Sequence, residues 1–387
     1  MFAVPQLPFE QAHPLQFAPR LRELQAKGVV HRVRTPVGDP AWLVTGHAEV
    51  LQLYDDDRLG AAPVEPDTVA RMYASDRPMP NFATEHADHA RKRALLQPHF
   101  TPKRLQTMRP RVHALTTKLL DDLAAKGSPA DLRATVAVPL PALVICELLG
   151  VPREESERFC TWITNVSDAH DPEQVEQGLA ELFAYSQQLI ARKRREPGDD
   201  VISRLCATEG VSADEAARLA TGLLWAGHGS PVPHIGLGVL LLLANPEQWR
   251  TLARDPTLAS NAVEETLRAA RTNVIFPRYA RTDLELNGAR IQAGDLVLMS
   301  IGAANYDPSV YADPDRVDIN RRALGHLTFG HGGRYCIAAA LARIELHAVL
   351  SQLASRFPAM QLAVGVAELT LRTHGSCGGL VELPVRW

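Results

Sequence analysis

The pattern of apolar and polar residues changes along the 387-residue chain and divides it into stretches of different predicted structure. Residues 29–46 alternate apolar and polar side chains around a turn, which predicts a β-hairpin. From about residue 47 to 260 the apolar spacing is mostly helical, and loops containing proline and glycine break it. Residues 61–85 hold four prolines and predict one long loop. The first two thirds of the chain are therefore expected to be mainly helical.

A second change of pattern begins near residue 273. Three short runs, VIFPRYA, LELNGARI and DLVLMSI, read as strands, and Asn287 with Gly288 marks a hairpin turn. An irregular stretch covers about 305–328, a long helix is expected to start near Cys336, and a strand-like tail ends in VELPVRW. The order predicts a mainly α protein with a small β portion.

Composition and charge narrow the class of protein. Apolar residues make up 46% of the chain, enough for a large core, and the net charge of −3 does not favour wholesale nucleic-acid or membrane binding. The five cysteines lie far apart without a CxxC pair, which argues against a disulfide scaffold or a four-cysteine zinc site and fits a reducing cytoplasm. The N-terminus lacks a signal-peptide pattern, and the most apolar run, Ile235–Ala244, is about half of a membrane span. We expect a soluble cytoplasmic protein.

One cysteine stands in a distinctive setting, in the sequence FGHGGRYCIAAALARIE, residues 329–345. A lone cysteine among apolar residues is most often a small buried hydrophobe. A phosphate-binding loop is disfavoured because no Lys-Ser/Thr follows the glycines. The third interpretation is metal ligation by the thiolate of Cys336, which the start of a helix would stabilise. Glycines allow close approach to a flat partner, and Arg334 offers a cation for a carboxylate on it, so the pattern suits haem iron with one axial thiolate.

This segment resembles the haem-binding signature of the cytochrome P450 family, FGxGxHxCxGxxLARxE. The matching residues are Phe329, Gly330, Gly332, Cys336, Leu341, Ala342, Arg343 and Glu345. Arg334 replaces the common histidine, and Ala338 replaces a usual glycine at the start of the helix. The resemblance implies haem b as cofactor, with Cys336 as the iron ligand and Phe329, Gly330, Arg334 and Ala338 beside the haem. It also implies the P450 fold, in which haem lies between a long central helix and the helix after the cysteine.

Other segments resemble the family in order and spacing. AVEETLR places Glu265 and Arg268 three residues apart, like the structural ExxR pair of the family, and Arg321 fits the third member of that cluster. One carboxylate between two guanidiniums leaves the cluster positive, so backbone carbonyls are expected as further acceptors. ANYDP resembles the family's ANRDP, with Tyr306 in place of arginine. Because the similarity covers nearly the whole chain, we expect residues 1–387 to form a single domain.

The resemblance also implies which residues bind the two haem propionates. His89 and Arg93 match the family's HxxxR, and Arg278 in FPRYA matches its PRxA arginine. With Arg334 they form a set of donors suited to a dianion in a mostly apolar pocket.

The oxygen-activating helix departs from the family pattern. Its usual acid–alcohol sequence is replaced by AGHGSPVP, residues 226–233, so that Gly229 stands at the acid and Ser230 at the alcohol. Pro231 and Pro233 cannot donate to the carbonyls four residues earlier, and a kink with a wet groove is expected. Ala226 and Gly227 would lie along the haem. His228 is expected to point away from the haem, with a substitute proton donor as the alternative.

Three functions stay open on this pattern. The first is hydroxylation or related oxidative tailoring of a small molecule or peptide in secondary metabolism, using O₂ and NAD(P)H electrons delivered by ferredoxin and its reductase or by flavodoxin. The second is oxidative aromatic coupling without oxygen insertion, and the third a non-catalytic haem protein that binds a ligand. The missing acid favours the last two, whereas Ser230 keeps the first open.

Two further sets of residues follow from the resemblance. Exposed cations near the cysteine loop would dock the electron donor, and the candidates are Arg91, Lys92, Lys103 and Arg104. The substrate pocket is expected to include part of the 61–88 region and the residues Phe82, Leu223, Asn273, Val274 and Ile275.

Overall fold

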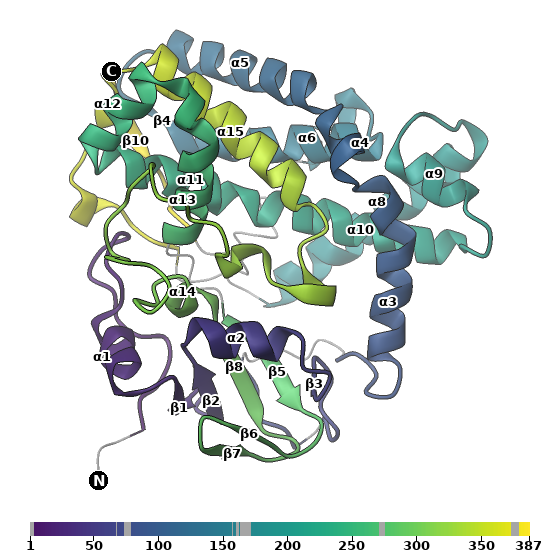
Figure 1. Cartoon of the computed structure of the whole chain (residues 1–387). Helices are drawn as coiled ribbons and strands as arrows, with labels where there is room; N and C mark the ends of the chain where they lie inside the picture. The colour runs from purple at the N-terminus through teal and green to yellow at the C-terminus, as the bar shows by residue number, and fades with distance from the viewer. Residues whose placement is uncertain are drawn as a thin grey trace. The chain divides into compact units, whose positions relative to one another are not determined.

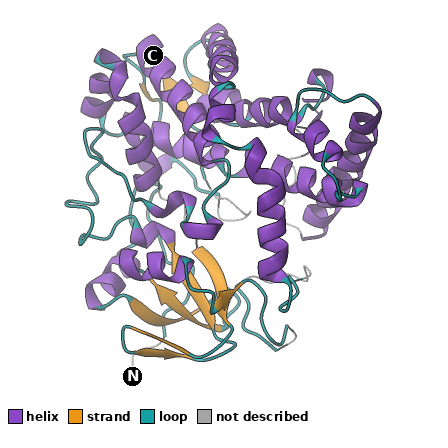
Figure 2. Ribbon diagram, turned by 45° about the vertical axis from the view of Figure 1, so that its right-hand side comes forward, coloured by secondary structure: helices purple, strands orange, loops and turns teal. Residues whose placement is uncertain are grey.

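The computed structural model describes residues 4–66, 68–72, 79–156, 158–159, 162, 172–270, 275–372 and 379–387. Helices account for 54% of the protein and the strands form small sheets, which confirms the predicted fold class (Figure 2). The chain forms two compact units, each assembled from two separate segments. Unit 1 comprises Met1–Arg91 and Leu267–Cys336, and unit 2 comprises Lys92–Thr266 and Ile337–Trp387. The single domain expected over residues 1–387 stays a prediction.

Unit 1 holds most of the β structure. Its strands are β1 (Val30–Arg34), β2 (Pro40–Val44), β3 (Leu59–Gly60), β5 (Ile275–Ala280), β6 (Leu284–Leu286), β7 (Ala289–Ile291) and β8 (Leu296–Ser300). Its helices are α1 (Pro19–Lys27), α2 (His47–Tyr54) and α14 (Ile301–Ala304), while α3 (Glu85–Leu96) and α13 (Ala259–Ala269) each continue from one unit into the other.

The main sheet of unit 1 has the strand order β1-β2-β8-β5-β3 (Figure 1). The predicted first hairpin is confirmed, because β1 and β2 pair antiparallel from Val30 opposite Val44 to Arg34 opposite Pro40. Strand β2 runs parallel to β8, and the other pairings are antiparallel. The predicted turn is also confirmed: Asn287 and Gly288 have φ of 47° and 76° between β6 and β7, the left-handed geometry that such a tight hairpin requires.

Alternation along the strands sends apolar side chains to both faces of this sheet. One face packs against α2, where Val50, Leu53 and Tyr54 join Val297 and Met299 in a buried cluster. Figure 1 shows α2 lying across this face. The opposite face carries a second cluster that includes residues of β1, β2, β5 and β8 together with Leu24 of α1. Helix α2 is thereby held firmly, and its C-terminal end reaches the cysteine loop of the same unit.

Unit 2 contains most of the helices. They are α4 (Pro102–Gln106), α5 (Arg109–Lys126), α6 (Pro139–Leu149), α8 (Pro172–Arg195), α9 (Val201–Ala207), α10 (Ala213–Gly229), α11 (Pro231–Leu243), α12 (Pro246–Arg254) and α15 (Ala339–Arg356). A small sheet in the order β4-β10-β9 is formed by Ala130–Asp131, Pro384–Arg386 and Gln361–Leu362. The strand-like tail predicted at the C-terminus is confirmed by β10.

Helices α10 and α11 form the centre of unit 2. Helix α10 starts at Ser212, whose side chain accepts a hydrogen bond from the backbone N–H of Glu215, and it packs against α6 and α8. The backbone hydrogen bonds of α10 end at Gly229, and α11 begins at Pro231. The break occurs because Pro231 and Pro233 lack the backbone N–H groups that would continue the helical hydrogen bonds. The combined stretch Ala213–Leu243 is long and apolar enough to cross a membrane by those two measures alone, but 72% of its most apolar window is buried, as in a core helix.

Candidate functional site

The cysteine loop is shaped by backbone conformation. A single 3₁₀ turn, Leu327–Phe329, leads into Gly330 and Gly332, which have φ of 73° and 56°. The chain then folds back so that the backbone N–H of Cys336 donates to the carbonyl of Phe329 at 2.7 Å. Side chains rarely adopt these φ values, so glycine is required at both turns. The loop therefore holds the half-buried Cys336 in one fixed place in unit 1.

Asp55, at the C-terminal end of α2, lies against the same loop. A Cβ added to Gly332 would lie 1.8 Å from Oδ1 of Asp55, and Nε2 of His331 lies 3.3 Å from Oδ2 of the same carboxylate. Asp55 thus occupies the space that a side chain at position 332 would need. On the far side of Cys336, Ala338 is the N-cap of α15, which begins at Ala339, three residues after the cysteine.

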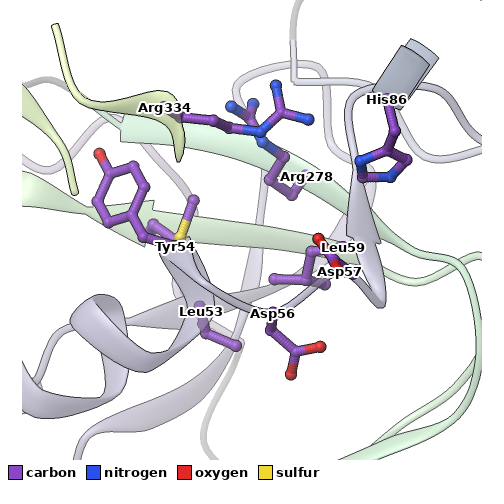
Figure 3. Close-up of a pocket in the computed structure, with 9 residues that line it drawn as sticks. Leu53, Tyr54, Asp56, Asp57, Leu59, His86, Arg278 and Arg334 are labelled. Atoms are coloured by element: carbon purple, nitrogen blue, oxygen red, sulfur yellow. The ribbon is translucent and has the colours of Figure 1, made fainter. Parts of the chain in front are cut away.

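A pocket in unit 1 gathers cationic and neutral donors beside this loop (Figure 3). Its described lining residues are Leu53, Tyr54, Asp56, Asp57, Leu59, His86, Arg278, Met299 and Arg334. Arg278 comes from β5 and Arg334 from the turn before Cys336, so strand pairing and the loop together place the two guanidiniums at one pocket. The structure thereby brings together two of the four residues predicted to bind carboxylates.

The electrostatics of this pocket favour an anion. Burial and the neighbouring charge of Arg334 lower the pKa of Arg278 below its ordinary value. Asp56 is already paired, because the guanidinium of Arg58 donates to it at 2.7 Å and lowers the pKa of its carboxyl. Within the described residues, neither Arg278 nor Arg334 forms a salt bridge with a carboxylate. Two close guanidiniums in this state repel each other, and a bound carboxylate relieves that repulsion.

Glu85, at the start of α3, fastens both ends of the preceding loop. Its buried carboxylate accepts hydrogen bonds from the backbone N–H groups of Ala61 and Ala62 at 2.8 and 2.9 Å and from Arg281 at 2.6 Å. Arg281 in turn donates to the carbonyl of Phe82 at 2.8 Å and lies 3.7 Å from the centre of its ring. The loop predicted over 61–85 is thus closed at its base by one carboxylate and one guanidinium.

The expected need of the ExxR cluster for backbone acceptors is confirmed. Arg268 is fully buried and donates to the carbonyls of Asn305 and Pro314, each at 3.0 Å. Arg321 donates to the carbonyls of Ala312 at 2.6 Å and Asp313 at 3.1 Å. Glu265 is also fully buried, and its predicted structural role stays a prediction. Arg268 ties the irregular 305–328 region to the end of α13, and Arg321 holds two carbonyls within that region.

Tyr306 compensates for the arginine that it replaces. Its hydroxyl donates to the carbonyl of Ala269 at 2.8 Å, and its ring stands 5.2 Å from the guanidinium carbon of Arg268. The tyrosine therefore keeps the irregular region attached to α13 through a hydrogen bond and a cation–π contact.

The central helix of unit 2 separates the predicted catalytic residues onto different faces. Ala226 and Ser230, four apart, are exposed, whereas Gly229 is buried. His228 is buried and its Nε2 lies 3.2 Å from the carbonyl of Val138, and its expected direction away from the haem stays a prediction. A Cβ added to Gly227 would lie 2.6 Å from Cγ1 of Ile145, so glycine permits the close approach of α10 and α6.

The remaining predicted residues are dispersed. Leu223 is buried in α10, Ile275 opens β5 opposite Ser300, and Phe82 packs on Arg281. Asn273 and Val274 lie outside the described residues, so the substrate pocket stays a prediction. The docking candidates Arg91, Lys92, Lys103 and Arg104 are exposed.

The residues that line the arginine pocket overlap only in part with the predicted propionate-binding residues, whose role stays a prediction. His89 lies half-buried on α3 in unit 1 but is not one of the described residues lining the arginine pocket. His86, one helical turn earlier, lines it instead, and Arg93 belongs to unit 2. Sequence reasoning missed Tyr54 and His86, because neither belongs to a motif and only tertiary packing brings them to the arginines.

Comparisons with known proteins agree with this fold. The family profile described as Cytochrome P450 matches residues 248–363. Pentalenolactone synthase of Streptomyces exfoliatus is 39% identical and mycinamicin IV hydroxylase/epoxidase of Micromonospora griseorubida 38%, over 100% and 98% of both chains. The substrate-free structure of a polyene macrolide antibiotic pimaricin epoxidase matches 100% of each chain, with a TM-score of 0.91 and 38% identity.

A mainly helical fold with a cysteine loop of this form defines a haem-thiolate oxidoreductase. The chain belongs to the cytochrome P450 family, and it is an enzyme of the kind that performs oxidative tailoring in secondary metabolism.

The residues present fit the haem that the family implies. Haem carries two carboxylates, and the described pocket of unit 1 offers Arg278 and Arg334 without a carboxylate partner. The glycine turns of the cysteine loop leave its backbone free of side chains at Gly330 and Gly332. Donor chemistry and backbone shape are both those that an anionic, flat cofactor needs.

Proposed function

We propose that Cys336 is the axial ligand of the haem iron and that Arg278 and Arg334, with His89 and Arg93, bind its propionates. A thiolate ligand lets the haem activate dioxygen. The hydrogen bond from the backbone N–H of Cys336 to the carbonyl of Phe329 supports the first assignment, since it holds the cysteine at the turn. The two neighbouring guanidiniums of the pocket, neither of which forms a salt bridge with a carboxylate within the described residues, support the second.

We further propose that the enzyme hydroxylates, or otherwise oxidises, a small-molecule or peptide secondary metabolite in the cytoplasm. Its electrons would come from NAD(P)H through ferredoxin and its reductase or through flavodoxin. The names of the relatives support the substrate class, since they act as a pentalenolactone synthase, a mycinamicin IV hydroxylase/epoxidase and a pimaricin epoxidase. Exposed Arg91, Lys92, Lys103 and Arg104 would dock the acidic donor protein.

The observation that carries the mechanism is the lack of an acid beside Ser230. Gly229 has no side chain and is buried, and the imidazole of His228 is directed at Val138. Ser230 is then the hydroxyl left on the exposed face of the helix between residues 226 and 230. We propose that substrate groups supply the protons that a carboxylate usually relays, while Ser230 holds a hydrogen bond beside them.

The missing acid also favours a second function, oxidative coupling of aromatic groups, because coupling inserts no oxygen atom. One experiment separates the two. The enzyme is reconstituted with ferredoxin, reductase and NAD(P)H, and candidate metabolites that displace the axial water in a spectral screen are incubated under ¹⁸O₂. A product that gains one labelled oxygen atom supports oxygenation, and a product lighter by two hydrogen atoms supports coupling. Ligand binding without product from any spectral binder contradicts both.

A further inference from the structure

Tyr54 lies where three elements of unit 1 meet. It is the last residue of α2 and is 8% exposed. Its ring stands edge-on to Phe276 of β5, with ring centres 6.2 Å apart. A Cβ added to Gly330 would lie 3.4 Å from its Cε1, so the ring also touches the cysteine loop. The packing leaves the phenol little freedom to turn.

The hydroxyl of this buried tyrosine has no hydrogen-bond partner among the described residues. Burial raises the pKa of Tyr54, so the phenol keeps its proton and remains a donor. A buried donor without an acceptor is costly and is rare in folded proteins. Tyr54 lines the same pocket as Arg278 and Arg334 (Figure 3), so an anion bound there would offer an acceptor to all three donors.

We infer that Tyr54 is a positioning residue for the haem, donating its hydroxyl proton to the carboxylate that Arg278 and Arg334 bind. The inference rests on the proposed haem site and adds to it a residue that lies outside every matched motif. The guanidiniums attract the carboxylate through their charge. The phenol, whose ring is fixed by contacts with Phe276 and Gly330, would orient the carboxylate through one directional hydrogen bond. Tyr54 would thereby couple the cofactor's carboxylate edge to the loop that carries Cys336.

The test compares Tyr54→Phe with wild type, using native haem and haem dimethyl ester, which lacks free carboxylates. Release of each cofactor to excess apomyoglobin is timed, and the propionate bending band is recorded by resonance Raman spectroscopy. The matched control is Tyr279→Phe, an equally buried tyrosine of unit 1 whose hydroxyl donates to the carbonyl of Ala70 at 2.9 Å. We expect Tyr54→Phe to release native haem about tenfold faster, the effect of losing a hydrogen bond to a charged acceptor, and to shift the band. With the dimethyl ester, Tyr54→Phe and wild type should release cofactor equally fast.

Each other outcome overturns a distinct claim. Unchanged release of native haem, with wild type intact, would reject the role of Tyr54 and leave the proposed function standing. Equal acceleration with both cofactors would show that only packing was lost. An effect that persists with the ester and responds to added propanoate would identify a free carboxylate as the ligand instead. A wild-type protein that binds no haem would reject the proposed function itself.

Discussion

The cysteine side of unit 1 and the centre of the α10–α11 stretch in unit 2 differ in how many groups fix them. In unit 1, Arg268 and Arg321 each donate to several carbonyls of the 305–328 region, and in the cysteine loop the backbone N–H of Cys336 donates to the carbonyl of Phe329. At residues 229–233, in contrast, one side chain is absent and two backbone donors are lost to proline. The segments that resemble the family's haem-binding motifs keep most of its pattern, with exchanges at Tyr306, Arg334 and Ala338, whereas residues 229–233 lack the family's acid.

This difference separates two demands on one enzyme. Binding an anionic cofactor requires the same charges and turns whatever the substrate. Where Tyr306 stands in place of the family's arginine, its hydroxyl donates to the carbonyl of Ala269 and so keeps the irregular region attached to α13. Proton delivery depends on the substrate, so its residues can be lost when the substrate brings suitable groups. We expect mutations around the cysteine loop to weaken haem binding, and mutations at residues 229–233 to change the amount of product formed per NAD(P)H consumed.

The largest effect is expected at Cys336. Cys336→Ser replaces the thiolate, so the red-shifted Soret band of the reduced, CO-bound protein should disappear. Cys206→Ser, at a half-buried cysteine of α9, is the control and should keep the band. Persistence of the thiolate-type band in Cys336→Ser would refute the assignment.

The next largest effect is expected at the carboxylate-binding arginines. Each charge-assisted bond contributes on the order of 2 kcal/mol, so the double variant Arg93→Ala/Arg278→Ala should lose haem readily and unfold at lower temperature. Arg290→Ala, at an exposed arginine of β7, serves as the control. Wild-type haem retention and melting temperature in the double variant would defeat the proposal.

Ser230→Ala tests the substrate-facing region. If substrate groups supply the protons, the amount of product formed per NAD(P)H consumed should fall by less than about tenfold. Tenfold corresponds to about 1.4 kcal/mol in the difference between the barriers to product formation and to unproductive NAD(P)H consumption. Gly229→Asp should bring no gain, because the substrate already fills the role of the acid. A larger loss of coupling in Ser230→Ala would instead assign proton delivery to the enzyme.

A smaller effect is expected at Glu345, the last residue of the matched signature, which lies in unit 2. Burial raises the pKa of its carboxyl to about 8, so the folded protein keeps a proton that the unfolded chain releases above its ordinary pKa of 4.5. Stability should therefore fall as pH rises from about 4.5 to 8. Glu345→Gln should remove this slope and make the protein more stable than wild type at pH 8. Parallel pH profiles of melting temperature for the two proteins would contradict this.

The smallest effect concerns electron delivery. Exposed cations that steer an acidic ferredoxin are screened by salt, so the reduction rate should fall a few-fold between low and high ionic strength. Lys103→Gln/Arg104→Gln should flatten this dependence, with Arg290→Gln as the control. A rate that does not change with salt would remove these residues from the docking surface.

Local patterns in the sequence sufficed for much of the fold. Period-two alternation around residues 29–46 and the Asn287–Gly288 turn predicted hairpins that the structure contains, since both depend on neighbouring residues. The meeting of Arg278 and Arg334 was predictable only from the family resemblance, because 55 residues separate them and the pairing of β5 with β8 brings the first into place.

The missed residues depend on packing between distant segments. Tyr54 reads as an ordinary apolar position of an amphipathic helix, and His86 stands one turn before the histidine that the family pattern selects. Their contact with the pocket follows from the placement of α2 on the sheet and of α3 beside it, which no local pattern encodes. The same limit applies to the substrate pocket.

The fastening made by Glu85 and Arg281 bears on how such an enzyme changes its substrate over evolution. These two side chains join the ends of the segment between Ala62 and Phe82, and inside it Ala70 accepts a hydrogen bond from Tyr279 of β5 while Met72 is buried in the core of the sheet. A longer insert costs only the added entropy of loop closure, about 0.6 kcal/mol for each doubling of length. A stretch transplanted from a relative, cut at residues 62 and 82, must therefore keep an acceptor for the Tyr279 hydroxyl and an apolar side chain at the place of Met72.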